Sequence, residues 1–145
     1  MSTETDLMQL YSQRILALAA EIPRVGRLDA PTASVKKRSP LCGSTVTVDL
    51  AVSDGTITDY AQDVKACALG QAAASIVGAG VVGLDMASVQ KGRDQLFAML
   101  KEDGPVPEAP FDGLEVLLPA KDYKNRHASI MLALDATVDA LKQAS

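Results

Sequence analysis

Hydrophobic residues near the start of the chain recur at steps of three and four positions. They are Leu7, Leu10, Tyr11, Ile15, Leu18 and Ile22. This spacing places the apolar side chains on one face of an α-helix. We therefore predict an amphipathic helix over about residues 4–20, which Pro23 ends. The Pro-, Gly- and charge-rich segment that follows, residues 23–40, reads as a surface connection with a short edge strand near residues 33–37.

The period of the pattern then changes from helical to alternating. Val46, Val48, Leu50 and Val52 alternate with Thr45, Thr47, Asp49 and Ala51. Such alternation is typical of a half-buried β-strand. The Ser-Asp-Gly stretch at 53–55 predicts a hairpin turn, because Asp-Gly tolerates the positive φ of a tight turn. A second strand should follow over about residues 56–62.

The pattern after Cys67 is helical again and continues so to the end of the chain. A helix rich in small residues should start at Cys67 and reach Gly83, and a second should span about residues 86–101. After a loop, residues 111–118 could form one or two helical turns before Pro119. The last helix should start near Asn125, with one apolar face. Its members are Ile130, Met131, Leu134, Val138 and Leu141.

The order of these elements predicts an α+β fold. A helix comes first, then a small three-stranded antiparallel sheet, and then the helices that pack on it. The chain has 145 residues, which suits one domain over residues 1–145. A domain of this length buries enough surface to fold without disulfides.

Composition narrows the functional classes. A net charge of −4 argues against general binding to nucleic acid or to an anionic membrane. The first residues lack the basic and apolar regions of a signal peptide, and the Gly- and Ala-rich run 72–84 is too short to span a membrane. We therefore expect a cytoplasmic protein, in which thiols stay reduced. Its two cysteines should then be free or metal-bound.

Three side chains stand out as candidate ligands, namely Cys42, Cys67 and His127, the one histidine. A thiol at the start of a helix meets unpaired backbone N–H groups, which favour the thiolate that binds zinc or iron. His127 opens the last helix, where its imidazole could point into the sheet–helix junction. Buried cysteines and a lone histidine are often only part of a core, and no Cys-x-x-Cys pair is present. The spacing alone leaves both interpretations open.

Other motifs carry less information. The segment "GAGVVG" at 78–83 superficially looks like a nucleotide-binding loop, but it follows a predicted helix where such loops follow a strand. The basic run "KKRS" at 36–39, close to Cys42, is either a docking patch for a partner or a solvated loop, and such runs are more often solvated. The run "KNR" at 124–126 could hold His127 or an anionic sulfur species.

Longer motifs give the chain a family resemblance. They are "EIPRVGRL" at 21–28, "PLCGSTVTVDL" at 40–50, "DGTITDYAQDVKACALGQAAAS" at 54–75 and "LLPAKDYKNRHASIMLALDA" at 117–136. Together they resemble the NifU/IscU-like family of iron–sulfur cluster assembly scaffolds over nearly the full length, and the position of Gln71 is closest to the SufU-type branch. The resemblance implies a three-stranded sheet packed by helices, in which Cys42 and Cys67 approach each other.

The resemblance also implies a ligand site, and two positions of that site carry different residues in this sequence. Family members bind iron, zinc or a two-iron, two-sulfur cluster through three cysteines, an aspartate and in some members a histidine. Here Ser44 stands at the aspartate position, and the third cysteine is replaced by Ser129, or by Ala128 if the alignment shifts by one. Cys42, Cys67 and His127 would then be the ligands, with Ser44 or a water in the fourth position.

The functional expectation is a scaffold that carries a cluster or metal and is not an enzyme. The implied partners are a cysteine desulfurase and apo-protein acceptors. The rival hypothesis is a degenerate paralogue that acts as an interaction or regulatory module without accepting sulfur. A zinc-dependent sulfurtransferase partner, as in the SufU-type branch, is disfavoured because the acceptor thiol is missing.

Overall fold

The protein is described by a computed structural model over residues 12–40 and 43–145. The elements in chain order are α2 (Gln13–Ala20), β1 (Ala33–Arg38), β2 (Thr45–Ser53), β3 (Thr56–Lys65), α3 (Ala68–Gly80), α4 (Met86–Lys101), the 3₁₀ helix η1 (Asp112–Asp122) and α5 (Lys124–Ala144). The α+β fold class is therefore confirmed. The part of the first predicted helix before residue 12 and Cys42 lie outside the described residues.

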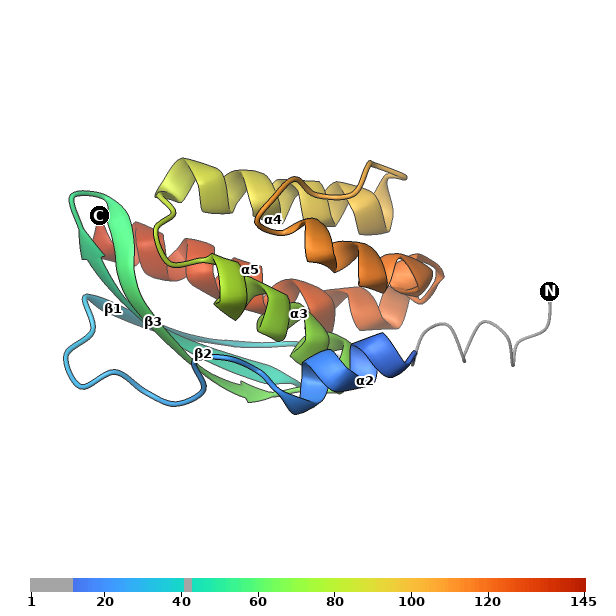
Figure 1. Ribbon diagram of the computed structural model, residues 1–145, viewed down its shortest axis with the longest axis horizontal. Helices are drawn as coiled ribbons and strands as arrows, with labels where there is room; N and C mark the ends of the chain where they lie inside the picture. Colours follow the sequence, from blue (N-terminus) through green and yellow to red (C-terminus); the bar gives the residue numbers. More distant parts are fainter. Residues whose placement is uncertain (1–11, 41–42) are drawn as a thin grey trace.

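A three-stranded antiparallel sheet in the order β1-β2-β3 forms one side of the molecule (Figure 1). Asp54 and Gly55 both have positive φ, 53° and 78°, as the Asp-Gly signal predicted for the turn between β2 and β3. The structure extends β3 to Lys65, three residues beyond the predicted end at 62. The edge strand predicted near residues 33–37 is confirmed as β1, which includes the basic run 36–38, so the interpretation of this run as a loop was wrong, although Lys36 and Arg38 are exposed to solvent.

One face of the sheet is covered by α3 and α5, and α4 packs on α5 from the opposite side (Figure 1). α5 therefore lies in the middle of the molecule, which explains why it is buried on more than the one predicted apolar face. Leu132, Ala133 and Thr137 are buried beside the expected residues. Thr137 donates to the carbonyl of Ala133 and accepts a 2.8 Å hydrogen bond from the hydroxyl of Tyr60 on β3. Burial raises the pKa of Tyr60, because the charged phenolate would lose its solvation there.

The other face of the sheet, which we call the open face, carries the alternate residues of each strand. Part of it is covered by the segment that joins α2 to β1. There Asp49 accepts hydrogen bonds from the guanidinium of Arg27 at 2.7 and 3.1 Å, from the amide of Leu28 and from the hydroxyl of Ser34. The side chain of Asp49 is only 1% exposed. Burial acts to raise the pKa of Asp49, but these donors outweigh it and lower the pKa below its ordinary value.

The outer edge of β3 is covered by two separate segments. Gly26 donates to the carbonyl of Gln62, and Gln62 donates to the carbonyl of Arg24, which forms a short parallel bridge. Further along the same edge, Ile57 donates to Leu84 and accepts from Gly83. Backbone groups of β3 that would otherwise face solvent are thus paired at both places.

Candidate metal centre

Cys67 occupies the position at which β3 gives way to α3. It is the N-cap residue of α3, with extended backbone angles (φ −66°, ψ 170°), and its side chain makes no capping hydrogen bond. The side chain is half-buried. The sulfur is therefore held at the first turn of a helix, as the sequence predicted, and stays within reach of solvent.

A serine of α5 lies next to this sulfur. The Sγ atom of Cys67 is 3.5 Å from the Oγ atom of Ser129, and the hydroxyl of Ser129 donates a 3.1 Å hydrogen bond to the Oγ atom of Ser44. Since a serine hydroxyl has one proton, this arrangement makes the Cys67 thiol the donor to Ser129. Ser129 and Ser44 are 1% and 5% exposed, so the chain of hydroxyls leads inward from the half-buried sulfur.

The close approach of α3 and α5 depends on a glycine. A Cβ atom placed on Gly70 would lie 2.5 Å from the Oγ atom of Ser129 and 2.9 Å from the Cβ atom of Ala66. No side chain larger than a hydrogen fits there without a shift of one helix. Gly70 therefore allows Ser129 to reach Cys67.

The connection from β1 to β2 brings a third segment to the same place. Ser39 donates to the carbonyl of Ser44, and Gly43 donates to the carbonyl of Ser39. Gly43 has a φ of 70°, a conformation that glycine adopts without strain. Ser44 is thus fixed beside Ser129. Cys42, two residues earlier in the sequence, lies outside the described residues, so its predicted approach to Cys67 stays a prediction.

His127 lies on another side of α5. Its Nε2 atom is 3.0 Å from the carbonyl oxygen of Ala120 and 2.9 Å from that of Lys121, both in η1. Two carbonyls can only accept, so Nε2 carries the proton and donates. Residues two apart on a helix are separated by about 200° around its axis, which directs His127 away from the direction of Ser129. The imidazole points to η1 and α4, and not into the sheet–helix junction expected from the sequence.

The surroundings of His127 agree with this placement. The histidine is 1% exposed, its Nδ1 atom has no hydrogen-bond partner, and it borders a hollow of about 280 Å³ with Leu100, Lys101 and Lys124. Both Leu100 and Lys101 belong to α4. Cys67, Ser129 and Ser44 are therefore brought together by the fold, whereas His127 is not part of that group.

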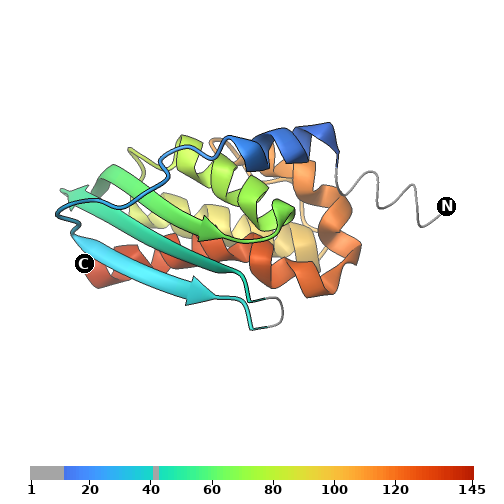
Figure 2. The same ribbon diagram turned by 90° about the horizontal axis from the view of Figure 1, so that it is seen from below.

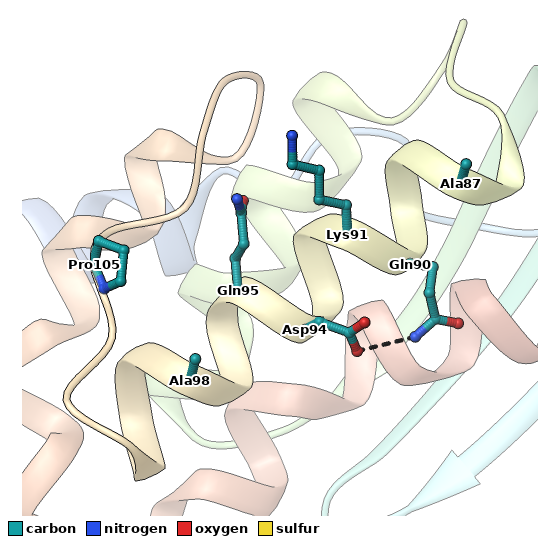
Figure 3. Close-up of a pocket in the computed structure, with 7 residues that line it drawn as sticks. All are labelled: Ala87, Gln90, Lys91, Asp94, Gln95, Ala98 and Pro105. Atoms are coloured by element: carbon teal, nitrogen blue, oxygen red, sulfur yellow. Dashed lines mark hydrogen bonds between the residues drawn. The ribbon is translucent and has the colours of Figure 1, made fainter.

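Acidic and metal-binding side chains form no complete three-ligand centre in the described part of the chain. Within residues 12–40 and 43–145, no three His, Cys, Asp or Glu side chains gather closely enough to hold a metal ion. A hollow of about 520 Å³ lies along the outer side of α4, where Gln90 donates to Asp94 at 3.0 Å (Figure 3). Neither cysteine nor histidine lines this hollow, and its other members include Ala87, Ala98 and Pro105.

Comparison with known proteins assigns the family. Residues 10–141 match the family model of the NifU-like N terminal domain. The chain belongs to this family. The NifU-like domain is 44% identical to the N-terminal part of a nitrogen-fixing NifU-like protein from Brucella abortus, whose crystal structure it matches with a TM-score of 0.94 over 96% of each chain.

One further relative of this NifU-like domain and one protein of similar fold are scaffolds by name. The iron-sulfur cluster assembly scaffold protein IscU of Thermotoga maritima is 25% identical over 142 residues, which are 94% of this chain and 95% of that protein. A putative scaffold protein for the SUF system from Fervidobacterium islandicum shares the fold, with a TM-score of 0.82, 17% identity, and coverage of 92% of this chain and 98% of that one. No helix in the described part of the NifU-like domain is long and apolar enough to cross a membrane.

Proposed function

We propose that this NifU-like domain is a scaffold that carries iron, zinc or an iron–sulfur cluster between partners, without turnover of its own. The single observation that carries the proposal is the contact of Cys67 with Ser129 and of Ser129 with Ser44. It joins the start of α3, the start of β2 and the first part of α5 at one half-buried sulfur. A thiol at which three segments distant in sequence meet can receive further ligands from each of them, which suits a ligand site.

The donor set suits a thiophilic metal. Thiolates of Cys67 and Cys42 would supply the soft ligands that zinc, iron and iron–sulfur clusters prefer. Ser44 and Ser129 would offer hydroxyl oxygens, which are poorer ligands than a carboxylate or a thiolate. A bound metal or cluster would therefore keep at least one weakly held position. Such a position is useful to a carrier because a ligand from a partner can take it during transfer.

The role of His127 in this proposal is limited by its hydrogen bonds. To act as a ligand with Cys67 it would have to break two bonds to η1 and turn about the axis of α5. We therefore assign metal binding to Cys42 and Cys67 with the two serines, and His127 to the anchoring of η1. A cysteine desulfurase and apo-protein acceptors remain the partners that the family relationship suggests, and the cytoplasm remains the expected compartment.

The test is the metal and sulfide content per chain after anaerobic reconstitution, measured by plasma spectrometry and sulfide assay. Cys67→Ala and Cys42→Ala should each lose stoichiometric metal, and Ser44→Asp should bind it more tightly. Ser53→Ala, which also truncates a side chain to alanine but at the exposed last residue of β2, is the matched control and should leave the content unchanged. Binding should weaken as the pH falls, because thiolate ligands compete with protons.

A wild-type protein without metal, or cysteine variants that both keep the metal content of the wild type, would overturn the proposal. The interaction-module hypothesis would then stand, since a fold of this family without a ligand site retains only its surfaces for function.

A further inference from the structure

Positive charge is distributed unevenly over the open face of the sheet. In the register of the sheet, Arg38, Thr45 and Lys65 lie side by side across β1, β2 and β3, and Lys36 lies two residues from Arg38 on the same face. Side chains directly opposite in neighbouring strands point to one face, and so do residues two apart. We call the three cations Lys36, Arg38 and Lys65 the basic end of the sheet.

The cations of the basic end lack the salt-bridge partners that other cations of the sheet region have. Arg24 pairs with Asp59, Arg27 with Asp49, and Lys37, on the opposite face, with Asp139. None of the three cations of the basic end forms a salt bridge within the described part of the chain, and all three are exposed. The chain as a whole has a net charge of −4, so this is a local excess against the overall sign.

Among the carboxylates on the open face, Asp63 is the one in the same cross-strand row as a member of the basic end, whereas Asp49 and Asp59 lie in other rows and pair with Arg27 and Arg24. Asp63 lies across Thr47 from Lys36, and its charge contributes to raising the pKa of Arg27, after the larger contributions of Asp49. Asp63 thus acts on a cation outside the basic end. Even if it is counted, three cations face one anion, and the local charge stays positive.

The basic end adjoins the candidate metal centre. Lys65 precedes Cys67 by two residues, and Thr45, between Arg38 and Lys65, follows Ser44. A guanidinium nitrogen of Arg38 lies 3.8 Å from the point where a Cβ atom on Gly43 would be. Figure 2 shows the end of β1, the start of β2 and the end of β3 together at this end of the sheet, with the start of α3 beside them.

We propose that the basic end is the docking surface for an acidic peptide segment of the partner protein that exchanges sulfur or a cluster at Cys67. This inference rests on the proposed function and adds the chemistry of the partner. Neighbouring strands are about 4.8 Å apart, so Arg38 and Lys65 are roughly 10 Å apart across the sheet. Acidic side chains two to four residues apart in an extended segment span about 7–13 Å, which matches this distance.

A protein segment fits these observations better than a nucleic acid does. Nucleic acids are bound by extended basic surfaces on domains of net positive charge. Here three cations stand on an acidic chain, immediately beside a half-buried thiol. The expected partner is therefore a protein that carries carboxylates close to the group that exchanges sulfur or a cluster with Cys67.

The test uses a ten-residue acidic peptide with a cysteine activated as its pyridyl disulfide, and a neutral peptide of the same length. In the exchange the Cys67 thiolate attacks the peptide sulfur, a new Cys67–peptide disulfide forms, the old S–S bond breaks, and pyridine-2-thiolate leaves and is measured by its absorbance. No external oxidant is needed. Fragment mass spectra assign the adduct to Cys67 and separate it from any at Cys42.

We expect the acidic peptide to react about ten times faster than the neutral one at low salt, as charge steering of this kind allows. The triple variant Lys36→Gln, Arg38→Gln, Lys65→Gln should bring the ratio of the two rates close to one. The matched control, Lys91→Gln, Lys101→Gln, Lys142→Gln, removes the same charge from α4 and α5 and should keep the ratio. High salt should abolish the preference in the wild type.

Because the ratio compares two peptides on one thiol, it cancels any change in the intrinsic reactivity of Cys67. A wild-type ratio near one, or an equal loss in both triple variants, would overturn the docking surface. A single-stranded oligothymidylate with the same activated disulfide and charge that reacts as fast as the acidic peptide would overturn the assignment to a peptide. The exchange needs no metal, so the metal content decides the proposed function separately.

Discussion

The sulfur of Cys67 lies 3.5 Å from the hydroxyl oxygen of Ser129, on a helix that begins 57 residues after Cys67 itself. The neighbouring residue Ala128 is half-buried, whereas Ser129 is 1% exposed and faces the sulfur. Of the two alignments that the sequence left open for the missing third cysteine, the contact favours the one that places Ser129 there.

This relationship predicts that Ser129→Cys restores a third sulfur to the site. The variant should bind more metal or cluster per chain than the wild type, and should take up sulfur from a cysteine desulfurase at residue 129. Mass spectrometry of proteolytic peptides detects the added sulfur. Ala128→Cys is the matched control, because it adds a thiol one position away, and it should produce neither effect. Equal gains from both variants would contradict the assignment of residue 129.

Gly70 should be needed for the same contact. Gly70→Ala places a methyl group 2.5 Å from the Ser129 hydroxyl and 3.1 Å from the Ser129 carbonyl oxygen, so the hydroxyl must turn away or α3 and α5 must move apart. Overpacking of this kind costs about 1–3 kcal/mol of the free energy of unfolding. Urea unfolding measures it, and metal content after reconstitution should fall as well. Gly113→Ala, whose new methyl would meet Ile76 at an ordinary 3.5 Å, is the control and should be nearly neutral; a comparable loss there would remove the argument.

His127 should contribute to stability more than to metal binding. His127→Ala removes the imidazole donor from the carbonyls of Ala120 and Lys121, of which the first keeps the amide of Tyr123, and a loss of about 1–3 kcal/mol in the free energy of unfolding is expected. His127→Gln offers an amide N–H in place of Nε2–H and should recover part of that loss. Both variants should keep the metal content of the wild type. Loss of metal in both, with little change in stability, would instead make His127 a ligand.

The buried carboxylate of Asp49, which pairs with the exposed Arg27, should shape the stability of the protein in acid. The pKa of Asp49 is lower in the folded than in the unfolded chain, so the unfolded state binds the proton first as the pH falls. The stabilisation is complete above the unfolded value of about 3.9 and is lost as the pH falls through the lower folded value. Asp49→Asn should therefore lower stability at neutral pH and flatten the acid limb of the stability curve.

The comparison for this prediction is Asp59→Asn. Asp59 pairs with Arg24 at 3.5 Å, but both side chains are largely in solvent, at 57% and 40% exposure. Exposed pairs contribute only about 0–1 kcal/mol, so this variant should change little. Chemical unfolding between pH 2 and pH 7 measures both. Curves of the same shape for the two variants would show that Asp49 does not control the acid limb.

The local elements were predictable because their signals are local. Asp54 and Gly55 predicted the hairpin turn, and the alternation of apolar and polar residues predicted β2. The helical spacing of apolar residues predicted α4 with the bounds observed. η1 was underestimated, because Pro119 was taken as its end. In 3₁₀ geometry a proline removes one hydrogen bond, and the turns continue to Asp122.

The site was only partly predictable, since it depends on which faces of α5 meet which neighbours. Cys67 at the start of α3 followed from its place in the sequence. Ser129 was recognised only through the family resemblance, as the residue at the position of the missing third cysteine. Nothing in the sequence predicted its hydrogen bond to Ser44. The direction of His127 was predictable from helix geometry. Residues two apart lie on almost opposite sides of a helix, so His127 and Ser129 could not both point to one sulfur.

The covering of the outer edge of β3 has a consequence for self-association. Segments 24–26 and 83–84 occupy that edge at two places, so among the described strands β1 has the one edge that no other described backbone segment covers; there the amide of Ser34 donates to the side chain of Gln143. A sheet with a single open edge can join one neighbouring sheet, edge to edge, and then has no edge left. Strand pairing between copies of the described domain would thus end at a dimer. A fibril of intact domains would not grow by this route, because each sheet would need a second edge that can pair.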